Sequence, residues 1–212
     1  NGAGKTTMMK LILNLAKPDC GNIRVFGEPV LPDSYTYLRY VGNLIETPCF
    51  YEKLSAGRNL RLHCEYMGIY EDGRIEQALE QVGLQGCEKK IVGKFSLGMK
   101  QRLGLANALL GSPKLVLLDE PTNGLDPAGI HEMRALVKSL PKEYGMTVMV
   151  SSHLLSEIDQ MATHTGIIDR GELIFQDSLA HLHEHSRKQI RLRTMDNQAA
   201  CRYLTEQEIS CR

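Results

Sequence analysis

The chain has 212 residues, of which 42% are hydrophobic, so it is long enough for one sizeable domain and an appendage. Lys and Arg number 25 and Asp and Glu also number 25, so the zero net charge gives no bulk argument for nucleic-acid binding. No apolar run approaches the roughly 20 residues of a membrane span, and the six cysteines lack CxxC spacing, which indicates free thiols in a reducing compartment.

The chain opens with a loop of small residues that carries one lysine, Asn1-Gly2-Ala3-Gly4-Lys5-Thr6-Thr7. This is the last part of the phosphate-loop pattern G-x-x-x-x-G-K-[ST]. Small residues let backbone N–H groups close around phosphate oxygens, while Lys5 brings positive charge to the β- and γ-phosphates and Thr6 offers a hydroxyl to Mg²⁺. A helix from Thr7 to about Ala16 is predicted to aim its positive end at the same anion. The first Gly of the pattern and the strand before it are missing, so we expect an N-terminally truncated fragment.

The next part of the chain begins with short strands and then becomes mostly helical. Strands are predicted at Ile23–Phe26 and Tyr37–Val41. Ser55 and Ser96 are good N-caps, and they begin two of the three helices that are predicted. The three predicted helices are Ser55–Met67, Arg74–Val82 and Ser96–Leu110. They form a helical block, at about residues 55–112, between two halves of an α/β core.

An apolar strand that ends in two adjacent acids follows, in the run LVLLDEPTNGLDP. A strand of pure Leu and Val is typical of a parallel sheet that is covered on both faces. The edge where such a strand ends is where ligands of α/β sheets bind, and two carboxylates there are costly unless a cation or a reaction needs them. Asp119 suits Mg²⁺, which takes hard oxygen ligands and shares its shell with phosphates. Glu120 suits a base or a group that orients water.

The rest of the chain alternates strand and helix patterns, which predicts a parallel sheet with crossover helices. The predicted elements are Leu115–Leu118, Ala128–Leu140, Thr147–Ser151, Leu154–Met161 and Gly166–Asp169, with Glu172–Gln176 as a final strand. From Ser178 the pattern changes to a short helix, a strand at Gln189–Arg193 and a helix at Asn197–Leu204. We therefore predict an α/β domain at residues 1–179 and the start of a small C-terminal α+β appendage at residues 180–212.

Five motifs in this order resemble those of the ATP-binding cassette (ABC) ATPases, a resemblance that covers the chain through about Leu179. It implies a P-loop NTPase-type parallel sheet core with a helical subdomain. In chain order, the motifs are the end of Walker A (Asn1–Thr7), the signature (Ser96–Gln101), Walker B with its following glutamate (Leu115–Glu120), the D-loop (Asn123–Asp126) and the H-loop (Ser151–His153).

Two positions depart from the usual family motifs. The Ser-Gly-Gly-Gln core of the signature reads Ser96-Leu97-Gly98-Met99, and Glu46 stands where the Q-loop glutamine is expected. With the runs FSLGMKQRLG and LIETPCFY, Glu46 resembles the bacitracin-resistance and lantibiotic-immunity branch of exporter ATPases, whose subunits pair with separate membrane permeases. Glu46 can ligate Mg²⁺ through an oxygen, but it adds a charge and lacks the amide donor.

The resemblance also implies the roles of individual residues. Two cassettes, expected to form a homodimer, meet head to tail and bury two ATP molecules. The implied catalytic residues are Glu120, which polarises the attacking water, His153, which contacts the γ-phosphate, and Lys5. The implied Mg²⁺ ligands are Thr6, Asp119 and Glu46. The implied ATP-binding residues are Asn1, Gly2, Ala3, Gly4, Lys5, Thr6, Thr7, Glu46 and Asp126, together with Ser96 and Gly98 of the partner.

The implied function is ATP hydrolysis that powers export of, or immunity to, a peptide antibiotic or a similar amphipathic compound through an integral-membrane permease. The subunit is then expected to be cytoplasmic, at the inner face of the cell membrane, and to pass motion to the permease through Glu46–Tyr51 and the helical block. For Phe50 and Tyr51, permease contact and simple packing are equal alternatives. The alternative function is a soluble ABC-type ATPase that acts on the ribosome or on DNA, which the compact Lys5–Ser96 segment and the balanced charge disfavour.

Overall fold

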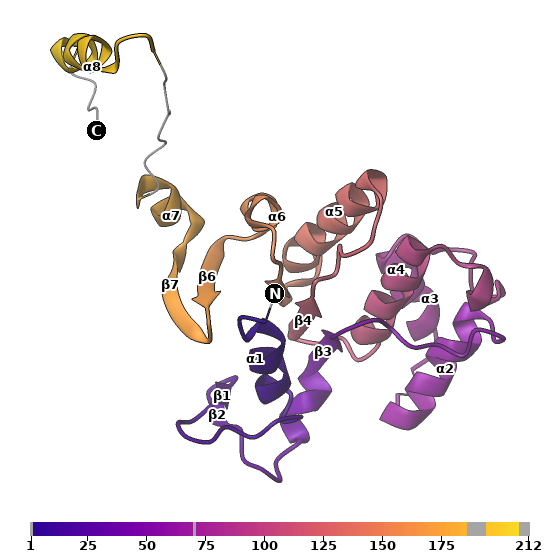
Figure 1. The fold of residues 1–212 in the computed structure, drawn as a ribbon. Helices are drawn as coiled ribbons and strands as arrows, with labels where there is room; N and C mark the ends of the chain where they lie inside the picture. Colours follow the sequence, from indigo (N-terminus) through magenta and orange to yellow (C-terminus); the bar gives the residue numbers. More distant parts are fainter. Residues whose placement is uncertain (1, 70, 186–193, 208–212) are drawn as a thin grey trace.

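The computed structural model of the protein describes residues 2–69, 71–185 and 194–207 (Figure 1). The predicted strand at Gln189–Arg193 lies outside these residues, as does Asn1. In chain order, the elements are α1 (Lys5–Ile12), β1 (Arg24–Val25), β2 (Glu28–Pro29), the 3₁₀ helix η1 (Thr36–Tyr40), β3 (Val41–Leu44), α2 (Ala56–Met67), α3 (Arg74–Gln81), the 3₁₀ helix η2 (Val92–Lys94), α4 (Leu97–Leu109), β4 (Leu115–Asp119), α5 (Pro127–Tyr144), β5 (Thr147–Ser151), α6 (Leu155–Met161), β6 (His164–Asp169), β7 (Glu172–Ser178), α7 (Leu179–His185) and α8 (Asn197–Glu206).

A parallel sheet of three strands, in the order β3-β4-β5, lies at the centre of the fold. Successive side chains of its middle strand, β4, point to opposite faces, and both faces are covered. Val116 and Leu118 pack into a core cluster with side chains from α2, α3, α4 and α5, whereas Leu117 packs into a second cluster with Leu13 and Val41. The predicted parallel α/β core is therefore confirmed, and Figure 1 shows α1 and α5 beside it.

The helical block consists of α2, α3 and α4, and it shares one hydrophobic core with the sheet. Leu60, Leu79 and Leu103 are fully buried in that core. Both predicted N-caps are confirmed, since the Ser55 hydroxyl accepts from Arg58 N and the Ser96 hydroxyl accepts from Met99 N, each at 3.2 Å. The block lies between β3 and β4 along the chain, and it packs directly onto the sheet that these strands form.

The run Tyr37–Val41 is not the strand that its sequence predicts. Thr36–Tyr40 forms a 3₁₀ helix, and the strand begins only at Val41. The Tyr37 ring is buried, and its hydroxyl donates to the carbonyl oxygen of Ile12 at 2.8 Å. This contact with the end of α1 outweighs the local β propensity, which depends strongly on tertiary context.

The first helix is also shorter than predicted, because it ends at Ile12 and not near Ala16. Asn14 stops it by adopting a φ of 57°, in the left-handed region that Asn tolerates better than most residues. The Asn14 side-chain amide then donates to the carbonyl oxygens of Leu31 and Pro32 at 3.0 and 3.1 Å. A tertiary contact therefore fixes the length of α1.

The prediction that the parallel sheet continues through Gly166–Asp169 is wrong in its pairing. Strand β6 pairs antiparallel with β7, in a separate two-stranded sheet. Asp169 pairs with Glu172 across a two-residue turn, Arg170-Gly171, whose φ angles are 48° and 86°. Two positive φ angles in a two-residue loop are typical of a tight hairpin, which makes the joined strands antiparallel.

Gly42, on β3, is packed so closely against α4 that no side chain fits there. A Cβ at this position would lie 2.2 Å from the carbonyl oxygen of Ala108. Gly42→Ala must therefore push β3 and α4 apart, and we expect the free energy of unfolding to fall by about 3 kcal/mol, as for overpacked cores. Urea unfolding measures this loss.

Gly111→Ala is the matched control, because the nearest neighbour of a Cβ there would be the Arg39 carbonyl oxygen at 3.6 Å. This change should be close to neutral. Similar losses of stability in the two variants would contradict the close approach of β3 and α4.

Candidate nucleotide site

Asp119 lies at the carboxyl edge of the parallel sheet, where β4 ends, and it is 8% exposed. Its Oδ2 accepts a hydrogen bond from the Thr6 hydroxyl at 2.7 Å, and its Oδ1 accepts from the Ser151 hydroxyl. The start of α1, the end of β4 and the end of β5 therefore meet at one carboxylate. These bonds satisfy a charge that would otherwise be costly to bury.

Glu120 follows directly and leaves the strand with a φ of 49°, an unusual backbone conformation for a residue with a side chain. Its N–H donates to the carbonyl oxygen of Ser151 at 3.2 Å and to the Ser151 hydroxyl at 3.1 Å, which hold this conformation. The Glu120 Oε2 is 2.7 Å from Nδ1 of His153, and Oε1 is 3.6 Å from Nζ of Lys5. Backbone outliers held by such contacts cluster at functional sites.

Two glycines of the loop before α1 adopt the left-handed backbone conformation. Gly2 and Gly4 have φ angles of 80° and 105°, which glycine adopts without steric cost. Gly4 is the N-cap of α1 and offers no side-chain cap, so the first-turn N–H groups, including those of Thr6 and Thr7, can face an anion. Gly171 N–H donates to the carbonyl oxygen of Ala3 at 3.1 Å, which ties the β6–β7 hairpin to this loop.

Four of the predicted site residues lie outside this cluster. Glu46 places its Oε1 2.7 Å from Nζ of Lys10 at the surface, and its side chain is 65% exposed. Ser96 and Gly98 lie at the start of α4, and Asp126 caps α5 by accepting from Gly129 N at 3.0 Å. Within residues 2–69, 71–185 and 194–207, no hydrogen bond or ion pair joins these four residues to the cluster around Asp119.

Sequence analysis placed Ser151 in the H-loop without giving it a role, and it missed Thr122 and Glu157, two further residues of this region. Glu157 is 3% exposed, and its Oε2 accepts from the hydroxyls of Thr122 and Ser152 at 2.7 and 2.8 Å. The only sequence signal for Ser151 and Thr122 is that each lies two positions from a predicted catalytic residue. Nothing in the sequence pattern marks Glu157.

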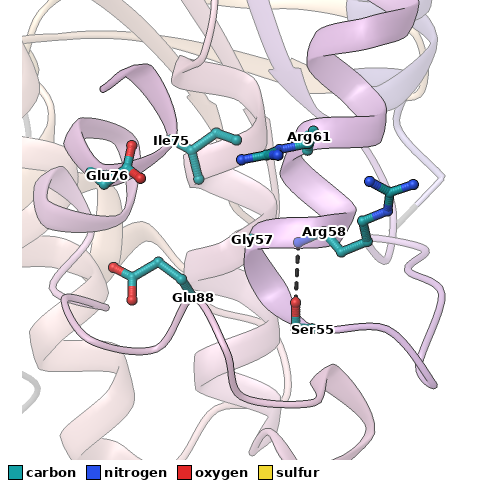
Figure 2. A pocket seen from close by; sticks show the side chains of 7 residues that line it. All are labelled: Ser55, Gly57, Arg58, Arg61, Ile75, Glu76 and Glu88. Carbon is teal, nitrogen blue, oxygen red and sulfur yellow. Dashed lines mark hydrogen bonds between the residues drawn. The ribbon is translucent and has the colours of Figure 1, made fainter. Parts of the chain in front are cut away.

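A separate cavity, of about 250 Å³, opens on the helical block (Figure 2). Arg58 and Arg61 line one side of it from α2, while Glu76 and Glu88 line the other. It shares no residue with the cluster around Asp119, so it is a feature of the block and not of the candidate nucleotide site. The full lining is Ser55, Gly57, Arg58, Arg61, Ile75, Glu76 and Glu88.

Comparison with known families finds two matching family models. The model described as "ABC transporter" matches residues 1–123, which is more than half of the chain. A second model, described as "AAA domain, putative AbiEii toxin, Type IV TA system", matches residues 90–159. The first match contains the phosphate loop and both acids at the end of β4.

Several curated relatives and solved structures are similar to this chain. The bacitracin transport ATP-binding protein BcrA of Bacillus licheniformis is 49% identical over 200 residues, which cover 94% of this chain and 65% of that protein. The lantibiotic transport ATP-binding protein SrtF of Streptococcus pyogenes is 46% identical over 83% of this chain and 75% of its own length. A solved ATP-binding subunit of an ABC transporter superposes with a TM-score of 0.73 at 29% identity, over 87% of this chain and 78% of that chain. The chain thus spans about two thirds of the length of BcrA.

Proposed function

This chain belongs to the ABC transporter family, and we propose that it binds and hydrolyses ATP to power export of, or immunity to, a peptide antibiotic or a similar amphipathic compound. The observation that carries this proposal is the convergence of Thr6, Asp119 and Glu120 at one edge of the sheet. The names of two relatives, a bacitracin transport and a lantibiotic transport ATP-binding protein, support the class of cargo.

The oxygens of Thr6, in α1, and Asp119, at the end of β4, fit Mg²⁺. The Thr6 hydroxyl and Asp119 Oδ2 lie 2.7 Å apart, and both are the hard oxygen ligands that Mg²⁺ prefers. When bound there, Mg²⁺ would neutralise phosphate charge and orient the γ-phosphoryl group. Lys5 and the first-turn N–H groups of α1 bind the phosphate oxygens, so Lys5 exchanges its contact with Glu120 for the substrate.

Glu120 is the group that orients the attacking water, and His153 orients Glu120. A histidine nitrogen that faces a carboxylate oxygen at 2.7 Å carries the proton and donates it, so Nδ1 of His153 fixes Oε2 of Glu120. The other carboxylate oxygen faces Lys5 and the phosphate side. Positioning and charge stabilisation supply most of the catalysis in phosphoryl transfer, and this arrangement supplies both.

Glu46 is the third proposed Mg²⁺ ligand, and it is paired with Lys10 in this structure. An exposed ion pair of this kind contributes only about 0–1 kcal/mol. Glu46 can therefore leave Lys10 for the metal at little cost. Its role as a ligand depends on that exchange.

The positions of Ser96 and Gly98 support a head-to-tail homodimer. Both residues lie at the start of α4, and a Cβ on Gly98 would meet only the Leu125 side chain, at 3.8 Å. They are thus open at a helix N-terminus and apart from their own phosphate loop, as expected if they close over the nucleotide of the partner.

We propose that the protein docks on a separate permease at the cytoplasmic face of the membrane, through the segment that contains Tyr51. Phe50 packs against the core, whereas Tyr51 is 61% exposed. The Asn59 side chain fixes the Tyr51 backbone by accepting from its N–H at 2.9 Å and donating to its carbonyl oxygen at 3.1 Å. An exposed aromatic ring on a fixed backbone is well suited to a protein interface.

The helices that the structure describes include none that is both long and apolar enough to span a membrane.

Glu120→Gln keeps the shape of the side chain but removes the charge that orients water. We expect kcat for ATP hydrolysis to fall ~100-fold or more while nucleotide affinity is retained. Turnover and nucleotide titration are measured on the purified protein. Glu172→Gln, at an exposed position on β7, is the control and should leave both unchanged. Near-normal turnover in Glu120→Gln would rule out the proposed role.

Tyr51→Ala removes the exposed ring while its backbone remains bonded to Asn59. We expect binding to the permease to weaken by about 2 kcal/mol, roughly 30-fold in Kd, and peptide-antibiotic resistance to fall. ATP hydrolysis by the purified subunit should not change. Tyr203→Ala, which removes a 65% exposed ring from α8, outside the helical block, is the matched control for both measurements. Equal resistance in the two variants would place the docking surface elsewhere.

A further inference from the structure

Glu157 is a buried acid with no part in the proposed chemistry. It lies in the first turn of α6 and is 3% exposed. Acids are almost never fully buried unless they are paired or hydrogen-bonded, because an isolated buried charge is strongly unfavourable. Its contacts therefore explain why the fold tolerates it.

One carboxylate oxygen of Glu157 accepts hydrogen bonds from two hydroxyl groups, which belong to two separate segments. Its Oε2 accepts from Thr122 at 2.7 Å and from Ser152 at 2.8 Å. Its Oε1 is 3.9 Å from a guanidinium nitrogen of Arg134, on α5, and Arg134 is also hydrogen-bonded to Gln160 on α6. Glu157 thus joins the segment after β4, the segment after β5 and helix α5.

Thr122 belongs to the turn that begins at Glu120. Asn123 N–H donates to the carbonyl oxygen of Glu120 at 3.0 Å, which closes a four-residue turn with Pro121 and Thr122 in the middle. Thr122 is 4% exposed, so its side chain anchors this turn from the inside. The direction in which the Glu120 backbone leaves β4 is therefore tied to Glu157.

Ser152 holds the turn that contains His153. Its hydroxyl accepts from Leu154 N–H at 3.1 Å while it donates to Glu157. A serine that bonds the backbone two residues ahead fixes a local turn. The position of His153 is therefore tied to the same carboxylate oxygen that holds the Glu120 turn.

We propose that Glu157 is a positioning residue that sets the separation between Glu120 and His153, and this inference rests on the proposed ATP hydrolysis. The two side chains meet at 2.7 Å, yet they belong to segments that follow different strands of the sheet, β4 and β5. Through Thr122 and Ser152, Glu157 holds both the turn that begins at Glu120 and the turn that contains His153. A misplacement of about 1 Å in a reacting group can cost roughly 100-fold in rate.

Glu157→Ala removes the shared acceptor and frees both turns. We expect kcat for ATP hydrolysis to fall roughly 30-fold or more, with KM for ATP within about twofold, because the phosphate-binding residues are untouched. Thr122→Val frees one turn alone, so its loss should be smaller, about tenfold. Glu157→Gln keeps an oxygen where both hydroxyls donate and should stay within about fivefold of the unchanged protein.

Asp159→Asn is the matched control, because Asp159 lies on the same helix but pairs with His183, at 2.6 Å. It should leave kcat and KM unchanged. Thermal unfolding of every variant accompanies the kinetics. A loss of kcat with KM preserved and with recovery in Glu157→Gln supports positioning, whereas kcat and KM that worsen together with the melting temperature would overturn it.

The decisive measurement is the turnover of Glu157→Ala and of Thr122→Val when each is combined with Glu120→Gln. If Glu157 acts through Glu120, neither Glu157→Ala nor Thr122→Val should lower the residual turnover further, whereas full additivity would overturn the proposal. If Glu157→Ala fails to fold, Thr122→Val provides the same comparison. If Glu120→Gln loses turnover but Glu157→Ala and Thr122→Val keep normal turnover, the positioning role of Glu157 is refuted and the proposed function stands. Normal turnover in Glu120→Gln refutes the proposed function.

Discussion

The buried carboxylate of Asp119 is the constraint on which the rest of the site depends. Strand β4 is apolar and covered on both faces, so an acid at its end must find hydrogen-bond donors within the protein. It finds them in Thr6, at the start of α1, and in Ser151, at the end of β5. These two bonds draw the phosphate loop and the strand before His153 to the same edge of the sheet. Hydrogen bonding of one charge thereby assembles segments that are more than a hundred residues apart.

At this edge of the sheet, the residues proposed to bind the metal are distinct from those proposed to orient the attacking water. Thr6 and Asp119 are bonded to each other and form the proposed metal-binding half, whereas Glu120 lies between His153 and Lys5 and forms the proposed water-orienting half. Ser96 and Gly98 lie at the start of α4, apart from both halves, as the proposed head-to-tail pair of subunits predicts.

The parts of the fold that follow from local pattern were predictable. The apolar run of β4, the exact span Thr147–Ser151 and the caps at Ser55 and Ser96 depend on neighbouring residues, and the structure confirms them. Tertiary contacts set the parts that were not predictable. The hydrogen bond of Tyr37 to α1 converts an expected strand into a 3₁₀ helix, and a two-residue turn reverses β7 against β6. The burial and contacts of Glu157 were not predictable for the same reason, because its partners are 5 and 35 positions away. The proposed roles of Glu46, Ser96, Gly98 and Asp126 still rest on family resemblance.

A structure of the protein with Mg²⁺ and a non-hydrolysable ATP analogue tests the central claim most directly. The account predicts that the metal binds Thr6 and Asp119, directly or through water, that Lys5 moves from Glu120 to the phosphates, and that Glu120 stays against His153. It also predicts that Glu46 leaves Lys10 for the metal. A nucleotide bound away from the loop at residues 2–7, or a Lys5 that remains on Glu120 while the phosphates are bound, would contradict the account.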